Sequence, residues 1–258
     1  MKKPLRKKQE VERFKVVVGI NSLGSSQYPS YSNHIQVFYR LGRSYPNIDF
    51  CLVNPNRMSI DRMRNLAAET ALDIEAKYLL FLDDDVLVPQ PFDFLKKFMD
   101  SDADIIAADV LIRGYPFNHM LFRWDKARRG LNQMKTLPKQ RGLIDVDAVG
   151  FSLCAIKVDL LRKMPKPYFI TGLTNTEDIY FCLNARKFHP ETTIMADTSI
   201  ICGHILWPEV IDSYNKKNYK TYFKKQFNPQ EEKKSSGDRG LEYYNIVKAG
   251  FDNAKKKH

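Results

Sequence analysis

The sequence predicts an α/β fold: a single domain with a mostly parallel central sheet and helices on both faces. Three observations lead to this fold class. Apolar runs of strand length alternate with amphipathic segments of helix length through the first half of the chain, an order typical of parallel sheets. The runs are continuous, as expected of strands buried on both faces. Polar residues directly follow several runs, at the edge where open α/β sheets bind ligands.

The elements of the first half are expected in a regular order. Ser32 and Ser59 are placed to cap the first two helices, and Pro91 to open the third. Strands are expected at 14–23, 48–53, 78–82 and 104–112, and helices at 33–41, 59–74 and 91–99.

The second half is less regular. A basic and aromatic stretch at 113–141 has no clear period. Gly150 lies within a strand-like segment, where a glycine permits the close approach of another group. The further elements expected are a strand at 143–155, helices at 158–164 and 179–188, and a strand at 193–201. We expect a basic tail at 1–13, a main domain at 14–206, and a basic, partly helical extension at 207–258 with a helix at 241–251.

The charge of the chain favours an anionic partner. Lys and Arg number 41 against 30 Asp and Glu, for a formal net charge of +11. The excess is concentrated at 2–8, 216–225 and 255–257. Nucleic acid, an anionic membrane surface and a phosphorylated substrate all fit this balance. The alternative is that the basic ends only keep the protein soluble.

Several classes of protein are disfavoured. No apolar run is long enough to span a membrane, and no apolar segment of a secretory signal follows the charged N-terminus. Neither a Gly-x-Gly-x-x-Gly nor a P-loop pattern occurs, which weakens a dehydrogenase or P-loop interpretation. The cysteines lack the spacing of a zinc site or a disulfide scaffold. We therefore expect a cytoplasmic protein with mostly buried free thiols at Cys51, Cys154, Cys182 and Cys202.

Three carboxylates, Asp83, Asp84 and Asp85, follow the apolar run of the third expected strand. Neighbouring carboxylates repel one another, so a fold needs a reason to collect them. Side chains alternate along an extended strand, so Asp83 and Asp85 would point to one side. Two carboxylates on one side suit a hard cation such as Mg²⁺ or Mn²⁺. The alternative is a solvated turn, or Asp85 as the cap of a following helix.

An ordered set of motifs surrounds this acidic run. Arg62-Met63-Arg64-Asn65 lies on the preceding helix, a glycine-containing strand runs from Val146 to Phe151, Glu177-Asp178 opens a later helix, and His204 follows a late strand. With Asp83 to Asp85 as an Asp-x-Asp motif, the set resembles the GT-A glycosyltransferases, which use nucleotide-sugar donors. The resemblance covers residues 14–206 and implies one catalytic domain there.

The resemblance implies roles for individual residues. Asp178 would be the catalytic base of an inverting transfer, or would orient substrate in a retaining one. The metal ligands would be Asp83, Asp85 and His204, holding Mn²⁺ or Mg²⁺. Donor-binding residues would be Asn21, Asn54, Arg62, Arg64, Asn65, Asp83 and Asp84, with Ser22 beside them; acceptor-side residues would be Gly150, Phe151 and Glu177.

Each role has a structural alternative. His204 could be a hydrogen-bonded core histidine. The arginines could form the solvated face of their helix, and Glu177 and Asp178 could complement a helix dipole.

The resemblance also implies partners. The donor would be a nucleotide sugar, with UDP-sugars the first expectation. A hydroxymethylated base in DNA is one predicted acceptor, because basic and aromatic residues alternate in 113–141 and 216–225 and could hold phosphates and a flipped base. The alternatives are a glycan or lipid at a membrane surface, a haloacid-dehalogenase-like phosphatase with Asp83 as nucleophile, and a non-catalytic nucleic-acid-binding protein.

Overall fold

The computed structural model describes residues 12–22, 28–55, 57–127, 129–173, 175–206, 209–217 and 220. The chain divides into two compact units, Met1–Lys216 and Lys217–His258. Every helix and strand described below belongs to the first unit. Most of the expected N-terminal tail, most of the expected C-terminal extension and the expected helix at 241–251 lie outside the described residues.

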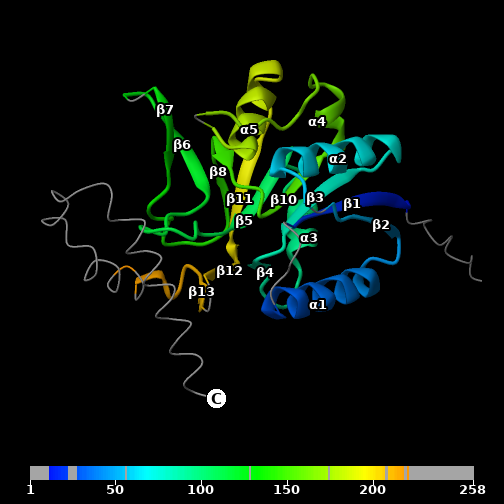
Figure 1. Cartoon of the computed structure of the whole chain (residues 1–258), viewed down its shortest axis with the longest axis horizontal. Helices are drawn as coiled ribbons and strands as arrows, with labels where there is room; N and C mark the ends of the chain where they lie inside the picture. The colour runs from blue at the N-terminus through cyan, green and yellow to red at the C-terminus, as the bar shows by residue number, and fades with distance from the viewer. Residues whose placement is uncertain are drawn as a thin grey trace, which may run out of the picture. The chain divides into compact units, whose positions relative to one another are not determined.

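A seven-stranded sheet of order β2-β1-β3-β10-β5-β11-β8 forms the centre of the first unit (Figure 1). Its strands are β1 (Phe14–Asn21), β2 (Ile48–Val53), β3 (Tyr78–Asp83), β5 (Ile105–Asp109), β8 (Leu143–Asp145), β10 (Leu153–Lys157) and β11 (Ile194–Ile201). β1 runs parallel to β2 and β3, and β5 runs parallel to β11. β10 and β8 are antiparallel to their neighbours. The prediction of a mostly parallel sheet is confirmed.

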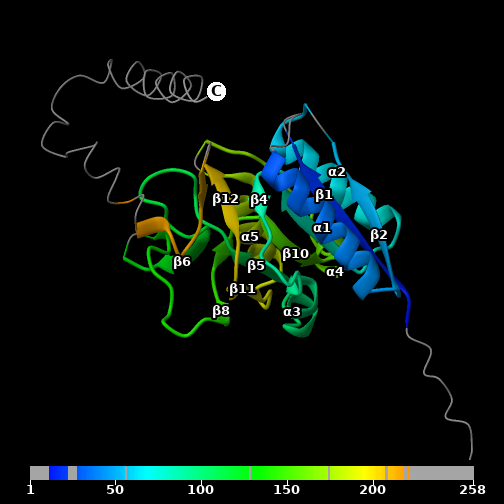
Figure 2. The ribbon, with the colours of Figure 1, turned by 90° about the horizontal axis from the view of Figure 1, so that it is seen from below.

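Helices cover both faces of this sheet, as predicted (Figures 1 and 2). One apolar cluster packs α2 (Ile60–Asp73), α4 (Val158–Arg162) and α5 (Glu177–Phe188) against one face. A second cluster packs α1 (Tyr28–Ser44) and α3 (Phe94–Asp100) against the other. Strand alternation explains the two layers: Leu79 and Phe81 join the first cluster, and Leu80 and Leu82 join the second.

Two three-stranded sheets flank the central one. The first contains β4 (Val86–Leu87), β12 (Gly203–Leu206) and β13 (Glu209–Ile211), in the order β13-β12-β4. The second contains β6 (Leu121–Asp125), β7 (Gly130–Gln133) and β9 (Ala148–Val149), in the order β7-β6-β9. The first compact unit extends past 206 to Lys216, because β13 pairs with β12.

Three elements differ from the sequence expectations. α1 begins at Tyr28, so Ser32 lies inside the helix and is not its cap. α3 begins at Phe94, after a turn that contains Pro91. The segment 143–155, expected as one strand, is divided among β8, β9 and β10, and each of the three pairs within a different part of the fold. Apolar residues alone did not reveal these breaks, since all three pieces are rich in them.

No helix in the described part of the chain has the length and apolar character needed to cross a membrane.

Three of the four cysteines are buried free thiols, and Cys51 is partly exposed. Burial raises the pKa of Cys182 to about 12 and raises those of Cys154 and Cys202 as well. Because the thiolate is the reactive species, we expect iodoacetamide to alkylate Cys51 in the native protein and the other three thiols only in urea. Mass spectrometry of the alkylated protein measures this order, and alkylation of a second thiol at the rate of Cys51 would contradict it.

Candidate active site

The candidate site lies at the carboxyl ends of β1 and β3, which are adjacent and parallel. Asn21 and Asp83 are paired in the register of these strands, and Asn21 Nδ2 donates a hydrogen bond to Asp83 Oδ1 at 3.2 Å. β3 ends at Asp83, and Asp84 and Asp85 form a turn. The predicted strand alternation therefore does not extend to Asp85, whose surroundings are set by the turn and by β12.

Asp85 and His204 face each other across β4 and β12. The backbone N–H of Ile205 donates to the Asp85 carbonyl oxygen at 3.0 Å, which fixes the two segments together. His204 Nε2 then lies 3.4 Å from Asp85 Oδ1. The other carboxylate oxygen, Oδ2, is 2.9 Å from Arg113 Nη1. Burial favours a raised pKa for Asp85, but the hydrogen bond and charge of His204 together with Arg113 lower this pKa below its usual value.

The tautomer of His204 follows from its second contact. Nδ1 is 2.6 Å from the carbonyl oxygen of Leu111, and a carbonyl only accepts hydrogen bonds, so Nδ1 carries a proton. With a proton on Nε2 as well, the ring is charged and faces Asp85 as a hydrogen-bond donor; without that proton, Nε2 directs a lone pair at the Asp85 carboxylate. Two electron-rich atoms in this arrangement require a cation or a proton between them.

The donor set fits a divalent cation held partly by protein. One imidazole nitrogen and one carboxylate are ligands that Mn²⁺ accepts, and most coordination positions would remain for water and diphosphate oxygens. Within the described residues, no group of three His, Cys, Asp or Glu side chains is arranged to hold a metal ion. Asp83, the third predicted ligand, has its Oδ1 directed to Asn21 and Arg64 instead.

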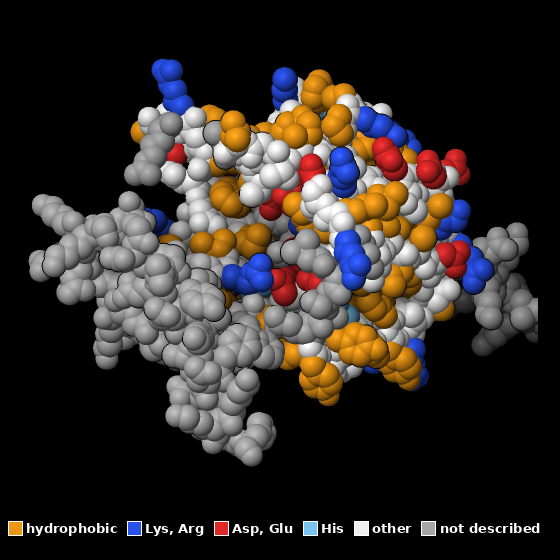
Figure 3. All heavy atoms as spheres, in the orientation of Figure 1, with side chains coloured by type: hydrophobic (Ala, Val, Ile, Leu, Met, Phe, Trp, Pro, Cys, Tyr) orange, Lys and Arg blue, Asp and Glu red, His pale blue; other side chains and the backbone are white. Residues whose placement is uncertain are grey.

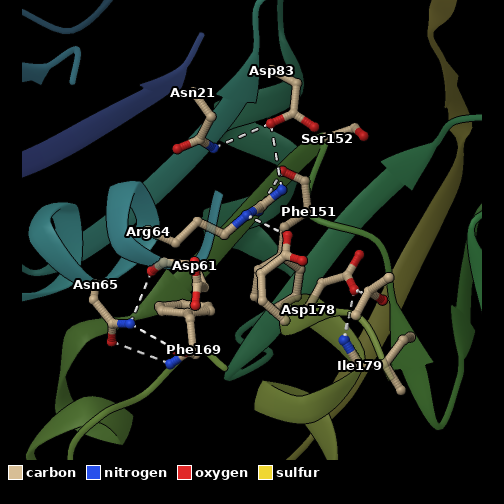
Figure 4. A network of polar contacts seen from close by, with 12 residues as sticks. Asn21, Asp61, Arg64, Asn65, Asp83, Phe151, Ser152, Phe169, Asp178 and Ile179 are labelled. Carbon is tan, nitrogen blue, oxygen red and sulfur yellow. Dashed lines mark hydrogen bonds and ion pairs between the residues drawn. The ribbon is translucent and has the colours of Figure 1, made fainter. Parts of the chain in front are cut away.

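Arg64 is the centre of a buried polar network (Figure 4). Its side chain is 3% exposed. Nη2 lies 3.4 Å from Asp83 Oδ1, and Nε lies 3.0 Å from Glu177 Oε1 in an ion pair without hydrogen-bond geometry. Nη1 donates to the Phe151 carbonyl oxygen at 3.1 Å. The guanidinium therefore connects the acidic end of β3 to the beginning of α5, and it does not lie on the solvated face of its helix.

Both carboxylates at the start of α5 are buried. Burial raises the pKa of Glu177, and the charge of Arg64 opposes the rise. Asp178 Oδ1 accepts hydrogen bonds from the Thr176 hydroxyl and, at 2.8 Å, from the Ile179 backbone N–H. These contacts fix the Asp178 carboxylate at the start of α5, and Phe151 lies between it and Asp83 in the view of Figure 4.

The Asp84 carboxylate is half buried beside β1. Burial raises its pKa, and a hydrogen bond from Ser22 opposes that rise. Figure 3 shows Asp and Glu side chains gathered near the middle of one face of the molecule, beside Lys and Arg side chains. A site of this polarity suits an anionic ligand that binds together with a cation.

The chain is similar to one protein family and to several solved structures. The model of the Anp1 family, a mannosyltransferase family, matches residues 48–167. A search of curated proteins found no match. Among solved structures, A197 from STIV is similar with a TM-score of 0.51 and 19% identity, over 77% of this chain and 93% of that one. Weaker likenesses are an apo UDP-glucose pyrophosphorylase, with a TM-score of 0.45 and 9% identity over 83% and 99% of the two chains, and residues 1–349 of S. aureus TarS, with 0.38 and 16% over 72% and 60%.

The protein has a GT-A-like fold. The fold agrees with the predicted resemblance, and the Anp1 match classes the chain as a glycosyltransferase. The matched segment includes Arg64, Asp85 and Phe151 and ends before Asp178 and His204.

Asn65 and Phe151 have structural functions in this GT-A-like fold. Asn65 Nδ2 donates to the carbonyl oxygens of Asp61 and Phe169, and Oδ1 accepts from the backbone N–H groups of Tyr168 and Phe169. These four bonds use both N–H groups and both lone pairs of the amide. Asn65 therefore has no hydrogen bond left to offer a nucleotide sugar. Phe151 is fully buried and packs against Phe81, Phe169 and Phe181, so only its carbonyl oxygen belongs to the polar network.

Two other predicted donor residues lie outside the network. Asn54 is exposed just beyond the end of β2, and Arg62 is exposed on α2. Arg62 borders a shallow pocket with Met58 and Lys166.

Gly150 provides the close approach that the sequence predicted, and the group that approaches is Met120. A Cβ on Gly150 would lie 2.5 Å from Met120 Cε and 2.9 Å from Met120 Cβ. We expect Gly150→Ala to lower the free energy of unfolding by about 1–3 kcal/mol through overpacking. Gly42→Ala in α1 is the control, because nothing lies within 4 Å of the new Cβ. This substitution should raise the free energy of unfolding by about 0.5–1 kcal/mol. Urea denaturation measures both, and equal effects would contradict the packing argument.

Sequence reasoning missed one buried cluster, at the end of β5. The carboxylate of Asp109 accepts hydrogen bonds from His119 Nδ1, Arg141 Nη1 and the Ser213 hydroxyl, and Lys216 Nζ contacts His119 Nε2. A signal was present, since Asp109 ends an apolar strand as Asp83 does. Two of its partners, Arg141 and Ser213, are 32 and 104 residues away, and no local pattern links Asp109 to them.

Proposed function

We propose that this protein transfers a sugar from a nucleotide-sugar donor to a hydroxyl group, with a divalent cation held by Asp85 and His204. The observation that supports this most is the geometry of that pair. His204 Nδ1 donates a hydrogen bond to the Leu111 carbonyl oxygen, and Nε2 lies 3.4 Å from Asp85 Oδ1. The pair lies at the carboxyl edge of the sheet, where open α/β folds bind ligands.

Different side chains would contact different parts of the nucleotide-sugar donor. Asn21 is hydrogen-bonded to Asp83, which is paired with Arg64, and we assign both to contact with the donor nucleoside, with Asp84 and Ser22 beside them. Mn²⁺ or Mg²⁺, when bound, would supply Lewis-acid stabilisation of the charge that develops on the leaving diphosphate. UDP-sugars remain the first donors to test. Asn54 and Arg62 remain proposed donor contacts at the edge of the site.

Asp178 is the proposed base of an inverting transfer. Its carboxylate is buried and fixed by the hydrogen bonds from Thr176 and Ile179, so a base at this position would be well oriented. It would accept the proton of the acceptor hydroxyl while the hydroxyl oxygen attacks the anomeric carbon. Glu177, held by Arg64, positions the start of α5 on the acceptor side.

The test is a thermal-shift screen of UDP, GDP, ADP and their sugar conjugates, with and without Mn²⁺. A ligand that binds the native state raises the melting temperature by mass action. We expect at least one nucleoside diphosphate to stabilise the protein only with Mn²⁺, and the matching nucleotide sugar to be turned over. Metal-dependent hydrolysis of a generic phosphomonoester, without any nucleotide effect, would instead indicate a phosphatase.

The acceptor that we propose first is a hydroxymethylated base in DNA. The cytoplasmic location also stays a prediction. Tyr115 and Trp124 are about half exposed in the basic stretch, and Arg123, the residue before Trp124, is exposed too. Aromatic and basic side chains together suit stacking on a base and contact with phosphates. Transfer to such DNA, compared with transfer to glycan and lipid acceptors from the same donor, decides between the acceptor classes.

A further inference from the structure

A single short turn contacts both members of the Asp85–His204 pair. Leu111, at its beginning, accepts the hydrogen bond from His204 Nδ1 at 2.6 Å. Arg113, two residues later, places Nη1 2.9 Å from Asp85 Oδ2. The turn therefore sets the tautomer of the histidine and compensates the charge of the carboxylate. Neither contact was expected from the sequence.

The turn is held in place at its base. Leu111 pairs with His119 in an isolated β-bridge, and the Ile112 N–H donates to the Asn118 carbonyl oxygen at 3.0 Å. Asp109 and His119, on either side of this segment in the sequence, are each about 1% exposed and are hydrogen-bonded to each other. This buried hydrogen bond joins the residues that precede and follow the turn, so the position of Arg113 beside Asp85 is set by the fold.

The burial of the two partners is unequal. The Asp85 side chain is 19% exposed, whereas that of Arg113 is 58% exposed. An exposed guanidinium with five donors has unused hydrogen-bonding capacity beside a single carboxylate oxygen. Arginine forks match the geometry of phosphate oxygens, and they bind them in pairs of parallel bonds.

We propose that Arg113 binds the diphosphate of the donor, and that without a donor it competes with the metal ion for Asp85. The proposal rests on the metal pair of the proposed function. A divalent cation held by Asp85 and His204 would neutralise the carboxylate, so the attraction of Arg113 for Asp85 would weaken and the guanidinium and the metal ion would repel each other. The diphosphate supplies the negative charge that both cations need. Metal and donor therefore bind cooperatively, with Arg113 contributing to the coupling.

The experiment compares the full-length protein with Arg113→Met, Arg113→Lys and the control Arg40→Met. Arg40 is an exposed arginine on α1, and its replacement leaves the site intact. Mn²⁺ binding to the protein alone is measured by electron paramagnetic resonance. Binding of UDP, GDP and ADP at saturating Mn²⁺ is measured by calorimetry, with the corresponding nucleosides as probes that lack the diphosphate.

For Arg113→Met we expect Mn²⁺ alone to bind at least as tightly as to wild type. The nucleoside diphosphate should bind roughly tenfold or more weakly, since a charge-assisted phosphate contact is lost. The affinity of Arg113→Met for the nucleosides should not change. The affinity of Arg113→Lys for the nucleoside diphosphate should lie between those of wild type and Arg113→Met, and that of Arg40→Met should match wild type.

Two results would overturn the proposal while leaving the metal pair intact: unchanged diphosphate affinity in Arg113→Met, or weaker Mn²⁺ binding without nucleotide, which would make Arg113 a structural support for Asp85. Failure of the wild-type protein to bind Mn²⁺ is a different result, because it overturns the proposed function itself and this proposal with it.

Discussion

Replacing Asp85 by asparagine is expected to lower kcat for sugar transfer by roughly a thousandfold or more, while the protein stays folded. The substitution keeps the shape of the side chain and removes the charge that would hold the cation opposite His204. Lewis-acid stabilisation of the leaving diphosphate is worth several kcal/mol, and each 1.4 kcal/mol or so of barrier is about tenfold in rate. The measurement is Mn²⁺-dependent transfer from the donor identified by thermal shift, with the melting temperature as a check on folding.

Asp100→Asn is the matched control for this substitution. Asp100 ends α3 in an exposed ion pair with Lys96, and such surface pairs contribute little. Its activity should equal that of wild type, and a chelator should reduce wild-type activity to the level of Asp85→Asn. If Asp85→Asn keeps activity within tenfold of wild type, the carboxylate does not hold an essential cation.

Replacing Arg64 by methionine should have the largest effect on stability, a loss of about 3–5 kcal/mol in the free energy of unfolding. The guanidinium is buried between Asp83 and Glu177 and donates to the Phe151 carbonyl oxygen. Methionine fills much of the space but leaves the buried Glu177 carboxylate and the partly buried Asp83 carboxylate without their counter-charge. Urea denaturation measures the change.

Arg62→Met is the control on the same helix, because Arg62 is exposed and its loss should change stability by no more than about 0.5 kcal/mol. Adding Glu177→Gln to Arg64→Met removes one of the unpaired carboxylates and should recover part of the lost stability. Equal losses for Arg64→Met and Arg62→Met would show that the buried network contributes nothing.

The effect of Arg64→Met should also depend on pH. Burial raises the pKa of Glu177 above its usual 4.5, and Arg64 opposes this rise, so the pKa is higher still in the variant. A carboxyl with a raised folded-state pKa contributes stability below its unfolded pKa and loses that contribution as pH rises through the folded value. The difference between wild type and variant should therefore be smaller near about pH 5 than near about pH 7.5. A difference that does not change with pH would contradict this account of Glu177.

The sequence by itself determined the layers of the fold. The continuous apolar run that leads to Asp83 predicted a buried strand, and the amphipathic helices on either side of it predicted a sheet covered on both faces; both predictions are confirmed. Hydrophobic periodicity depends only on residues that are close in the sequence, so it can be recognised from one sequence alone. It also placed Asp83 correctly at the end of its strand.

Only the tertiary structure decided what each polar residue does. Arg64 and Asn65 are adjacent in a motif, yet one lies in a buried ion-pair network and the other holds the backbone at Phe169. The turn at Asp85 brings this residue to His204 and Arg113, which come from distant parts of the chain. The reason is physical: the position of a side chain along an element follows from local pattern, whereas its charge partners are set by packing between elements that are remote in sequence.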